Sequence, residues 1–274
     1  MDIKTLTSGA LIKHPSRGLL LGTGPFRESA EPPDSGPAFY IDTFRLDDPR
    51  PWKIPAALHA LPAEGNPPPP APEIRWTERE GFCGITPETL FHQQSRRLET
   101  MALAGTARPE DEGVFINDDK EIREHEIVAG SILSRLSPFG SVTRTARSVL
   151  NLGTLIHFVT YLTLESDEQH TPAHWIRLLH PTPALGSQPR TENTLAQLDD
   201  WRSRLRCPLH FGAPFGFLED GDFFCLVGIR SLYWQGQRLA LCTGGGVVAS
   251  STLTHEWREL KLKRDTVRRS FHLP

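Results

Sequence analysis

The sequence predicts an α+β fold, an α/β sandwich with large and mainly antiparallel sheets. Short runs in which apolar and polar residues alternate, such as residues 74–86 and 96–106, are typical of strands. Apolar residues recur at helical spacing over residues 120–136 and 254–271. Strands and helices do not alternate regularly and no repeat occurs, which favours antiparallel over parallel sheets.

The remaining elements follow from local patterns. Residues 17–22 and 38–44 are short strand-like runs between glycines and prolines. Residues 145–165 fit either a helix or a buried strand. Residues 220–248 fit a hairpin that turns at Gln235-Gly236.

Proline content predicts the division of the chain. Residues 61–73, LPAEGNPPPPAPE, contain six prolines and are expected to form an extended linker. We therefore expect an abbreviated N-terminal part over residues 1–60, the linker over 61–73, and a main domain over 74–274.

Composition limits the function classes. The chain has 274 residues and a net charge of -3 without a basic stripe, so neither nucleic acid nor a membrane is expected as a partner. The first residues do not resemble a leader, and no stretch approaches the ~20 apolar residues of a membrane span. We expect a cytoplasmic protein whose four cysteines are reduced and mostly buried.

Two predicted helices carry carboxylates that could bind a metal. At 100° per residue, Glu256, Glu259 and Lys263 share one face of the last helix. They form either a surface ion pair between Glu259 and Lys263 or a Mg²⁺ site beside a cation that binds an anionic substrate. In residues 120–136, Glu124 lies at the border of the apolar stripe, where half-burial favours a bound cation. Glu121 and Glu126 are expected to be solvated.

Further polar groups fit either a ligand site or ordinary structure. Gly244 in CTGGGVV and Gly105-Thr106 in ALAGTA offer backbone N–H groups to a carboxylate, or form a turn or bulge. Arg230 lies among apolar residues and is expected to pair with a carboxylate. His157 is either a core histidine or a ligand contact.

Eight stretches, in order, resemble the chorismate-utilising enzymes: isochorismate synthase, salicylate synthase, and component I of anthranilate and aminodeoxychorismate synthases. The stretches are GITPETLF, ALAGTA, KEIREHEIV, IHFVTYL, LLHPTPALGSQP, VGIRS, TGGGVVASS and HEWRELKLK. The resemblance covers roughly residues 80 to 270. It implies the family's sandwich fold and makes residues 74–274 a chorismate-binding domain.

The resemblance also implies roles for individual residues. Mg²⁺ would be held by Glu124 and Glu259, with Glu256 close by. Glu88 in TPE matches the general acid that protonates the departing 4-hydroxyl. The substrate would be contacted through its carboxylates or its ring by a further set of residues: Gly105, Thr106, His157, Phe211, Arg230, Gly244 and Lys263.

The stretch LHPTPALG resembles the isochorismate and salicylate synthases, in which water is the nucleophile. The ammonia-using branches carry Gly-Thr where this chain has Pro183-Ala184, and lysine where it has Arg190. The implied reaction adds water at C2 of chorismate and removes the C4 hydroxyl, in menaquinone or siderophore biosynthesis. A monomer or weak homodimer is expected.

One part of the family pattern is missing. The strand resembling KVVLSR, which carries the general base, has no counterpart here. Lys4, Lys13 and Lys53 precede Glu88, and Lys53 is the nearest in sequence, so it is the candidate base. Two alternatives stay open: another chorismate conversion, of lyase or aminating type, and a catalytically weak chorismate-binding protein.

Overall fold

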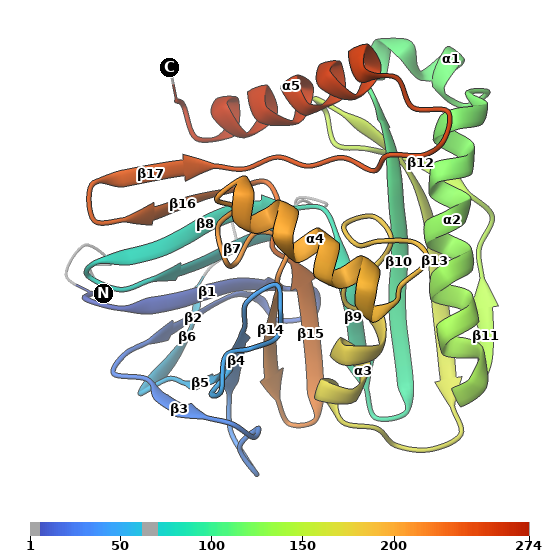
Figure 1. Cartoon of the computed structure of the whole chain (residues 1–274). Helices are drawn as coiled ribbons and strands as arrows, with labels where there is room; N and C mark the ends of the chain where they lie inside the picture. Colours follow the sequence, from blue (N-terminus) through green and yellow to red (C-terminus); the bar gives the residue numbers. More distant parts are fainter. Residues whose placement is uncertain (1–5, 62–70, 274) are drawn as a thin grey trace. The chain divides into compact units, whose positions relative to one another are not determined.

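The computed structural model describes residues 6–61 and 71–273 and divides the chain into two compact units (Figure 1). The first unit comprises Met1–Gln94 and Pro208–Cys242, and the second comprises Ser95–Cys207 and Thr243–Pro274. Residues 62–70 of the predicted linker, and Lys4, lie outside the described residues. The two ends of that linker are strand residues, because β6 ends at Leu61 and β7 begins at Ala71. The predicted division at residues 60 and 73 stays a prediction.

The first unit contains a seven-stranded antiparallel sheet in the order β17-β16-β8-β7-β1-β2-β6. Its strands are β1 (Gly9–His14), β2 (Gly18–Thr23), β6 (Ala57–Leu61), β7 (Ala71–Trp76), β8 (Glu80–Thr86), β16 (Ser231–Gln235) and β17 (Arg238–Leu241). Gln235 pairs with Arg238, so the predicted hairpin turns at Gly236-Gln237, one residue later than expected.

A second antiparallel sheet of the first unit has the order β9-β15-β14-β4-β5-β3. Its strands are β3 (Arg27–Ser29), β4 (Ala38–Ile41), β5 (Trp52–Ile54), β9 (Thr89–Gln94), β14 (Pro214–Glu219) and β15 (Asp222–Val227). Large aromatic side chains fill the core of this unit: Phe39, Trp52, Phe91, Phe215, Phe217 and Phe223. Edge-to-face contacts such as Phe39 on Phe217, 5.2 Å between centroids, join them.

In the second unit, helix α2 covers a small antiparallel sheet. The strands are β10 (Arg97–Ala107), β11 (Gly140–Arg144), β12 (Ser148–Asn151) and β13 (Ile156–Ser166), and the helices are α1 (Glu112–Phe115), α2 (Asp119–Leu136), α3 (Pro172–Leu179), α4 (Glu192–Arg204) and α5 (Leu253–Ser270). The apolar stripe of α2, including Val128 and Ile132, is buried as its 3.6-residue period predicts. Residues 145–165, for which helix and strand were both open, form β12 and most of β13.

The predicted fold class is confirmed, because helices pack with large antiparallel sheets. The four cysteines are free as expected, but only Cys225 is buried and the other three are half-buried. Among the described residues, no helix is long and apolar enough to cross a membrane.

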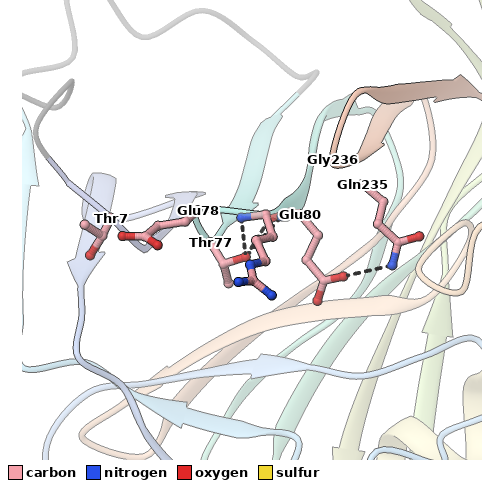
Figure 2. A pocket seen from close by; sticks show the side chains of 7 residues that line it. Thr7, Thr77, Glu78, Glu80, Gln235 and Gly236 are labelled. Carbon is pink, nitrogen blue, oxygen red and sulfur yellow. Dashed lines mark hydrogen bonds between the residues drawn. The ribbon is translucent and has the colours of Figure 1, made fainter.

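The ends of two hairpins in the first unit line an open hollow of about 700 Å³ (Figure 2). Its polar groups are used in turns: Gly236 N–H donates to the Arg79 carbonyl at 2.7 Å, and Gln235 Nε2 donates to Glu80 Oε2 at 3.4 Å. The lining residues are Thr7, Thr77, Glu78, Arg79, Glu80, Gln235 and Gly236. None of the predicted site residues is among them.

Candidate functional site

The first turn of α2 brings two glutamates into the second unit's interior. Asp118 caps the helix, and its side chain accepts hydrogen bonds from the N–H groups of Lys120 and Glu121. The buried stripe of α2 then carries Glu124 inward, to 7% exposure. Glu121 is only 2% exposed, because the Thr106 N–H donates to its Oε2 at 2.9 Å. The expectation that Glu121 is solvated is therefore wrong.

The last helix, α5, supplies two more glutamates from the face that its sequence predicts. Glu259 is buried together with Val267, and Glu256 is half-buried. Lys263 Nζ lies 2.5 Å from Glu259 Oε1 and donates to the Gly244 carbonyl at 3.1 Å. The predicted ion pair between Glu259 and Lys263 forms, but it is buried and does not lie on a wet surface.

We call Glu121, Glu124, Glu256 and Glu259 the acidic cluster, and its centre is the ammonium group of Lys120. The distances from Lys120 Nζ are 2.9 Å to Glu121 Oε1 and 3.1 Å to Glu124 Oε2. The same nitrogen lies 3.2 Å from Glu256 Oε1 and 3.8 Å from Glu259 Oε2. The ammonium group of Lys120 thus connects the N-terminal part of α2 to the N-terminal part of α5.

The charges of the acidic cluster do not balance. Its four carboxylates face two ammonium groups, Lys120 and Lys263, which leaves an excess of two negative charges when all six are ionised. Burial raises the pKa of Glu124 to about 7, and although Lys120 opposes this shift, the charges of Glu259 and Glu121 add to it. Burial would lower the pKa of Lys120, but the surrounding carboxylates outweigh it and raise that pKa well above its usual value.

Glu259 responds differently from Glu124. Burial would raise its pKa, but the positive charges of Lys263 and Lys120 outweigh burial and hold the pKa below its usual value. Glu259 therefore stays ionised near neutral pH, as a metal ligand must.

A glycine-rich loop after β17 closes over the acidic cluster. A Cβ on Gly246 would lie 2.5 Å from Glu124 Oε1, and one on Gly245 would lie 3.6 Å from Glu256 Oε2. Only a glycine fits at position 246 without moving Glu124. This close approach gives a reason for a glycine at position 246. The sequence alone did not decide whether the glycine-rich stretch binds a carboxylate or forms a turn.

A β-bulge in β10 places Gly105, Thr106 and His157 together. Ala104 pairs with Phe158 and Ala107 pairs with Ile156, so two residues of β10 face the single residue His157 of β13. Gly105 has a positive φ of 75°, which favours glycine at this position. The buried His157 Nδ1 donates to the Gly105 carbonyl at 2.8 Å and lies 3.3 Å from Thr106 Oγ1.

The acidic cluster fits a hard divalent cation such as Mg²⁺. Glu256 Oε1 and both oxygens of Glu259 are buried and contact ammonium groups. Carboxylate oxygens are the ligands that Mg²⁺ prefers, and the carboxylates of the acidic cluster outnumber its ammonium groups. Possible ligand atoms of Glu121, His255 and Glu259 also lie within 4.8 Å of one another, and two of these residues belong to the acidic cluster.

Three further predicted residues lie in the first unit. Glu88, between β8 and β9, is buried, and its N–H donates to Thr86 Oγ1 at 3.2 Å. Phe211 is also buried. Arg230 lies between β15 and β16 with a left-handed φ of 57°, and its carbonyl accepts from the Ile85 N–H at 3.4 Å. Their roles toward a substrate stay predictions.

Lys53, the candidate base, is held in place by structural contacts. It is buried in β5, and its Nζ donates to the Arg50 carbonyl at 2.7 Å, to Asp48 Oδ2 at 2.9 Å and to Glu28 Oε1 at 3.2 Å. These three acceptors use all three N–H bonds of an ammonium group. Lys53 thus connects β5 to the preceding loop and to Glu28 of β3, and this arrangement does not support its predicted role as a base.

Comparison with known proteins agrees with the resemblance. Residues 73–271, well over half of the chain, match the family described as chorismate binding enzyme. The chain belongs to this family.

Individual chorismate-binding enzymes are similar to it over part of their length. Isochorismate synthase EntC of Escherichia coli (strain K12) is 28% identical over 205 residues, covering 70% of this chain and 51% of EntC. The salicylate biosynthesis isochorismate synthase of Pseudomonas aeruginosa is 32% identical over 201 residues, covering 68% of this chain and 41% of that protein. The chain thus spans about half the length of these relatives or less.

A solved chorismate-binding enzyme has the same fold. The structure of MenF, the menaquinone-specific isochorismate synthase from Escherichia coli, superposes with a TM-score of 0.75 at 15% sequence identity. The superposition covers 96% of this chain and 89% of that chain. At this identity, the likeness shows the fold alone.

Within the second unit the structure brings together most of the predicted residues, and it adds three that sequence reasoning missed. Gly105, Thr106, Glu124, Glu256, Glu259 and Lys263 lie around the acidic cluster as expected. The additions are Lys120, Glu121 and His255. Lys120 could have been found from its i,i+4 spacing to Glu124, which brings two side chains together on a helix.

Proposed function

We propose that this protein is a Mg²⁺-dependent chorismate-binding enzyme of isochorismate synthase type. In this reaction water adds at C2 of chorismate, the ring double bond shifts, and the C4 hydroxyl leaves. The observation that carries the proposal is the buried acidic cluster with its excess of two negative charges beside Lys263 and the glycine-rich loop. Membership of the family supports the substrate class, and the similarity to isochorismate synthases supports the reaction type.

Glu124, Glu256 and Glu259 would hold the metal ion, while Glu121 Oε2 keeps its hydrogen bond from the Thr106 N–H. When bound there, Mg²⁺ would supply positive charge that holds a carboxylate of the anionic substrate. Lys120 would have to move away from the centre of the acidic cluster.

The other predicted residues have roles that do not depend on the metal. Lys263 and the backbone of Gly244 would bind a substrate carboxylate through charge-assisted hydrogen bonds. The carboxylic acid of Glu88 would protonate the departing 4-hydroxyl, which leaves as water. A base would take the proton from the attacking water.

A direct assay tests the reaction. Purified protein is incubated with chorismate and Mg²⁺. The products are separated by chromatography, and their masses are determined by mass spectrometry. We expect a product with the mass of chorismate and a different retention time. If chorismate is not consumed at high protein concentration, the proposed reaction is wrong, whereas a product that has lost pyruvate or gained nitrogen would indicate a different conversion.

Metal binding is tested separately by titration calorimetry with Mg²⁺. Glu259→Gln removes one buried carboxylate of the acidic cluster and is expected to weaken Mg²⁺ binding at least ~10-fold. Glu126→Gln is the matched control, because Glu126 lies on the same helix as Glu124 but is only half-buried and is paired with Arg144. Equal Mg²⁺ affinity in the two variants would show that the acidic cluster is not the metal site.

The contacts of Lys53 favour a second candidate, a chorismate-binding protein that turns over slowly or not at all. A lysine that donates to three acceptors is a poor proton acceptor. In that case chorismate with Mg²⁺ would raise the melting temperature of the protein without formation of product.

A further inference from the structure

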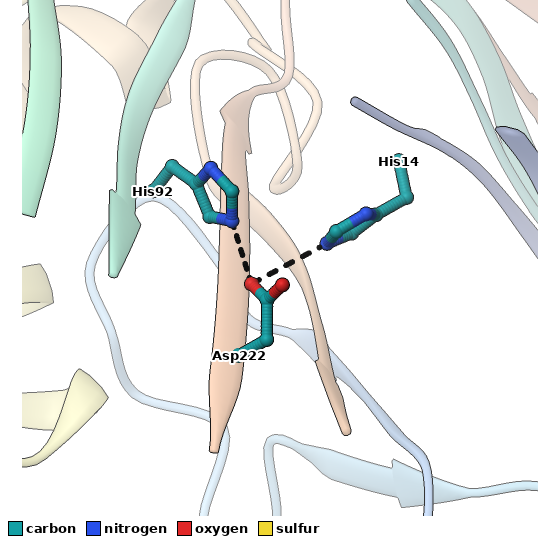
Figure 3. Close-up of side chains that lie close together, drawn as sticks. All are labelled: His14, His92 and Asp222. Carbon is teal, nitrogen blue, oxygen red and sulfur yellow. Dashed lines mark hydrogen bonds and ion pairs between the residues drawn. The ribbon is translucent and has the colours of Figure 1, made fainter. Parts of the chain in front are cut away.

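The first unit contains a second group of possible metal ligands, formed by His14 of β1, His92 of β9 and Asp222 of β15 (Figure 3). We call these residues the histidine cluster. Both imidazole rings point their Nε2 atoms at one carboxylate oxygen. Asp222 Oδ1 lies 2.6 Å from His92 Nε2 and 3.5 Å from His14 Nε2. The three ligand atoms all lie within 4.8 Å of one another.

His14 is the unusual member of the histidine cluster. Its side chain is fully buried, and its Nε2 faces Asp222 without forming a hydrogen bond. A buried polar atom without a hydrogen bond is costly, which calls for an explanation such as a bound ion.

Neighbouring groups fix the orientation of the ligands. Gln94 Nε2 donates to Asp222 Oδ2 at 3.0 Å, which leaves Oδ1 facing the two imidazoles. On the other side of the His14 ring, the Ser16 N–H donates to Nδ1 at 3.4 Å, and Ser16 Oγ lies 3.2 Å from the same nitrogen. These two contacts hold the His14 ring in its orientation.

We propose that His14, His92 and Asp222 bind a divalent transition metal of the Zn²⁺ class and thereby connect β1 to β9 and β15. Two imidazole nitrogens and one carboxylate oxygen are a ligand set for Zn²⁺ and similar first-row ions, whereas Mg²⁺ takes mainly oxygen ligands. With Zn–N and Zn–O bonds of about 2.0–2.1 Å, ligand atoms in a tetrahedron lie about 3.3 Å apart.

The observed geometry is close to that arrangement. The 3.5 Å between His14 Nε2 and Asp222 Oδ1 already fits it, and the His92 contact has to open by less than 1 Å. Exposure increases from 0% for the His14 side chain to 14% for His92 and 23% for Asp222, so the site is accessible to water at the Asp222 side. Arg17 lies near and disfavours a cation, but it is paired with Glu219.

Co²⁺ is a suitable probe for this site, because it replaces Zn²⁺ and absorbs visible light when bound in a tetrahedral site with nitrogen ligands. The full chain is stripped with a chelator and titrated with Co²⁺, and Zn²⁺ affinity is measured by competition. We expect one equivalent of Co²⁺ to produce the absorption band. His92→Gln and Asp222→Asn should each weaken binding by about 100-fold or more, since even the loss of an outer hydrogen-bond partner weakens metal binding 10–100-fold.

Matched variants separate this site from the acidic cluster. His59→Gln in β6 changes another half-buried histidine of the same unit and should leave Co²⁺ binding unchanged. Glu259→Gln should also leave the absorption band intact, so the outcome does not depend on the proposed function. Circular dichroism verifies that each variant is folded. Absence of the band, or a band that persists in both His92→Gln and Asp222→Asn, would overturn the proposal.

Discussion

The acidic cluster of the second unit and the histidine cluster of the first unit differ in the partners of their buried polar groups. The acidic cluster contains four carboxylates and brings its own cations, Lys120 and Lys263. The histidine cluster contains one carboxylate and two imidazoles, and among the described residues its His14 Nε2 has no hydrogen-bond partner. A metal ion at the acidic cluster has to displace an ammonium group. At the histidine cluster it would supply a partner for the buried His14 Nε2.

This difference predicts different metals at the two sites. Carboxylate oxygens select hard ions such as Mg²⁺, and imidazole nitrogens select Zn²⁺ and related ions. It also predicts that the acidic cluster, and not the histidine cluster, depends on a lysine for its stability without metal.

Lys120→Met should produce the largest effect. The substitution leaves buried carboxylates without their central counter-ion, and breaking a buried ion pair typically costs about 3–5 kcal/mol of stability. We expect this loss in urea unfolding with a chelator present, and a partial recovery with Mg²⁺, which no longer competes with the ammonium group.

Lys261→Met is the matched control, because Lys261 is exposed on α5 two residues before Lys263. It should unfold like the wild type in both conditions. If Mg²⁺ raises the unfolding free energy of Lys120→Met no more than that of the wild type, Lys120 and the metal ion do not compete for the same site.

Gly246→Ala should produce the next largest effect. The added Cβ would lie 2.5 Å from Glu124 Oε1, so the loop or the glutamate has to move. Overpacking of this kind costs about 1–3 kcal/mol of stability. We also expect weaker Mg²⁺ binding by calorimetry, while the Co²⁺ band of the histidine cluster stays unchanged. A variant with wild-type affinity for Mg²⁺ would show that the contact between Gly246 and Glu124 does not position a metal ligand.

Glu73→Gln tests a fully buried carboxyl of the first unit. Glu73 is fully buried in β7, accepts a hydrogen bond from Ser231 Oγ at 3.0 Å, and has no partner for Oε2 among the described residues. Burial raises its pKa from 4.5 to about 8. Between these values the folded state holds a proton that the unfolded state has lost, so stability falls as the pH rises through this window.

The slope from this one group is at most about 1.4 kcal/mol per pH unit, and it disappears above the folded pKa. Glu73→Gln should remove this contribution, which is measured by urea unfolding at several pH values between 4.5 and 8. Glu78→Gln, at an exposed position before β8, is the control. A slope that is the same in both variants would show that Glu73 ionises normally.

Gly130→Ala should produce the smallest effect and in the opposite direction. Gly130 lies in α2, and a Cβ there would contact nothing within 4 Å. Alanine in place of glycine stabilises a helix interior by about 0.5–1 kcal/mol. A rise in the melting temperature with unchanged Mg²⁺ and Co²⁺ binding would also make this variant the control for Gly246→Ala.

The sequence predicted the second unit's site better than the first unit's. Helical spacing placed Glu256, Glu259 and Lys263 on one face, because the period of a helix is fixed, but it did not decide whether that face is buried. The same rule failed for Glu121, since its burial depends on a hydrogen bond from Thr106 in a bulge of another strand. Strand pairings between distant residues decide such contacts.

The fold class was also predictable, and some elements were not. The alternation of residues 74–86 and 96–106 identified β7, β8 and β10. No pattern distinguished helix from strand in residues 145–165, since a continuous apolar run fits both. The histidine cluster could not be predicted, because it is created by the pairing of β9 with β15 and by the separate position of β1.

The first unit is discontinuous in the sequence, because residues 95–207 of the second unit lie between its two parts. During synthesis on the ribosome, β1 and β9 emerge long before β15, which pairs with β9 and carries Asp222. The second unit is likewise incomplete until α5 has been made. Contacts between such distant segments form slowly, and their apolar surfaces stay exposed meanwhile. Nascent chains of this protein should therefore depend on chaperones until nearly the whole sequence has been translated.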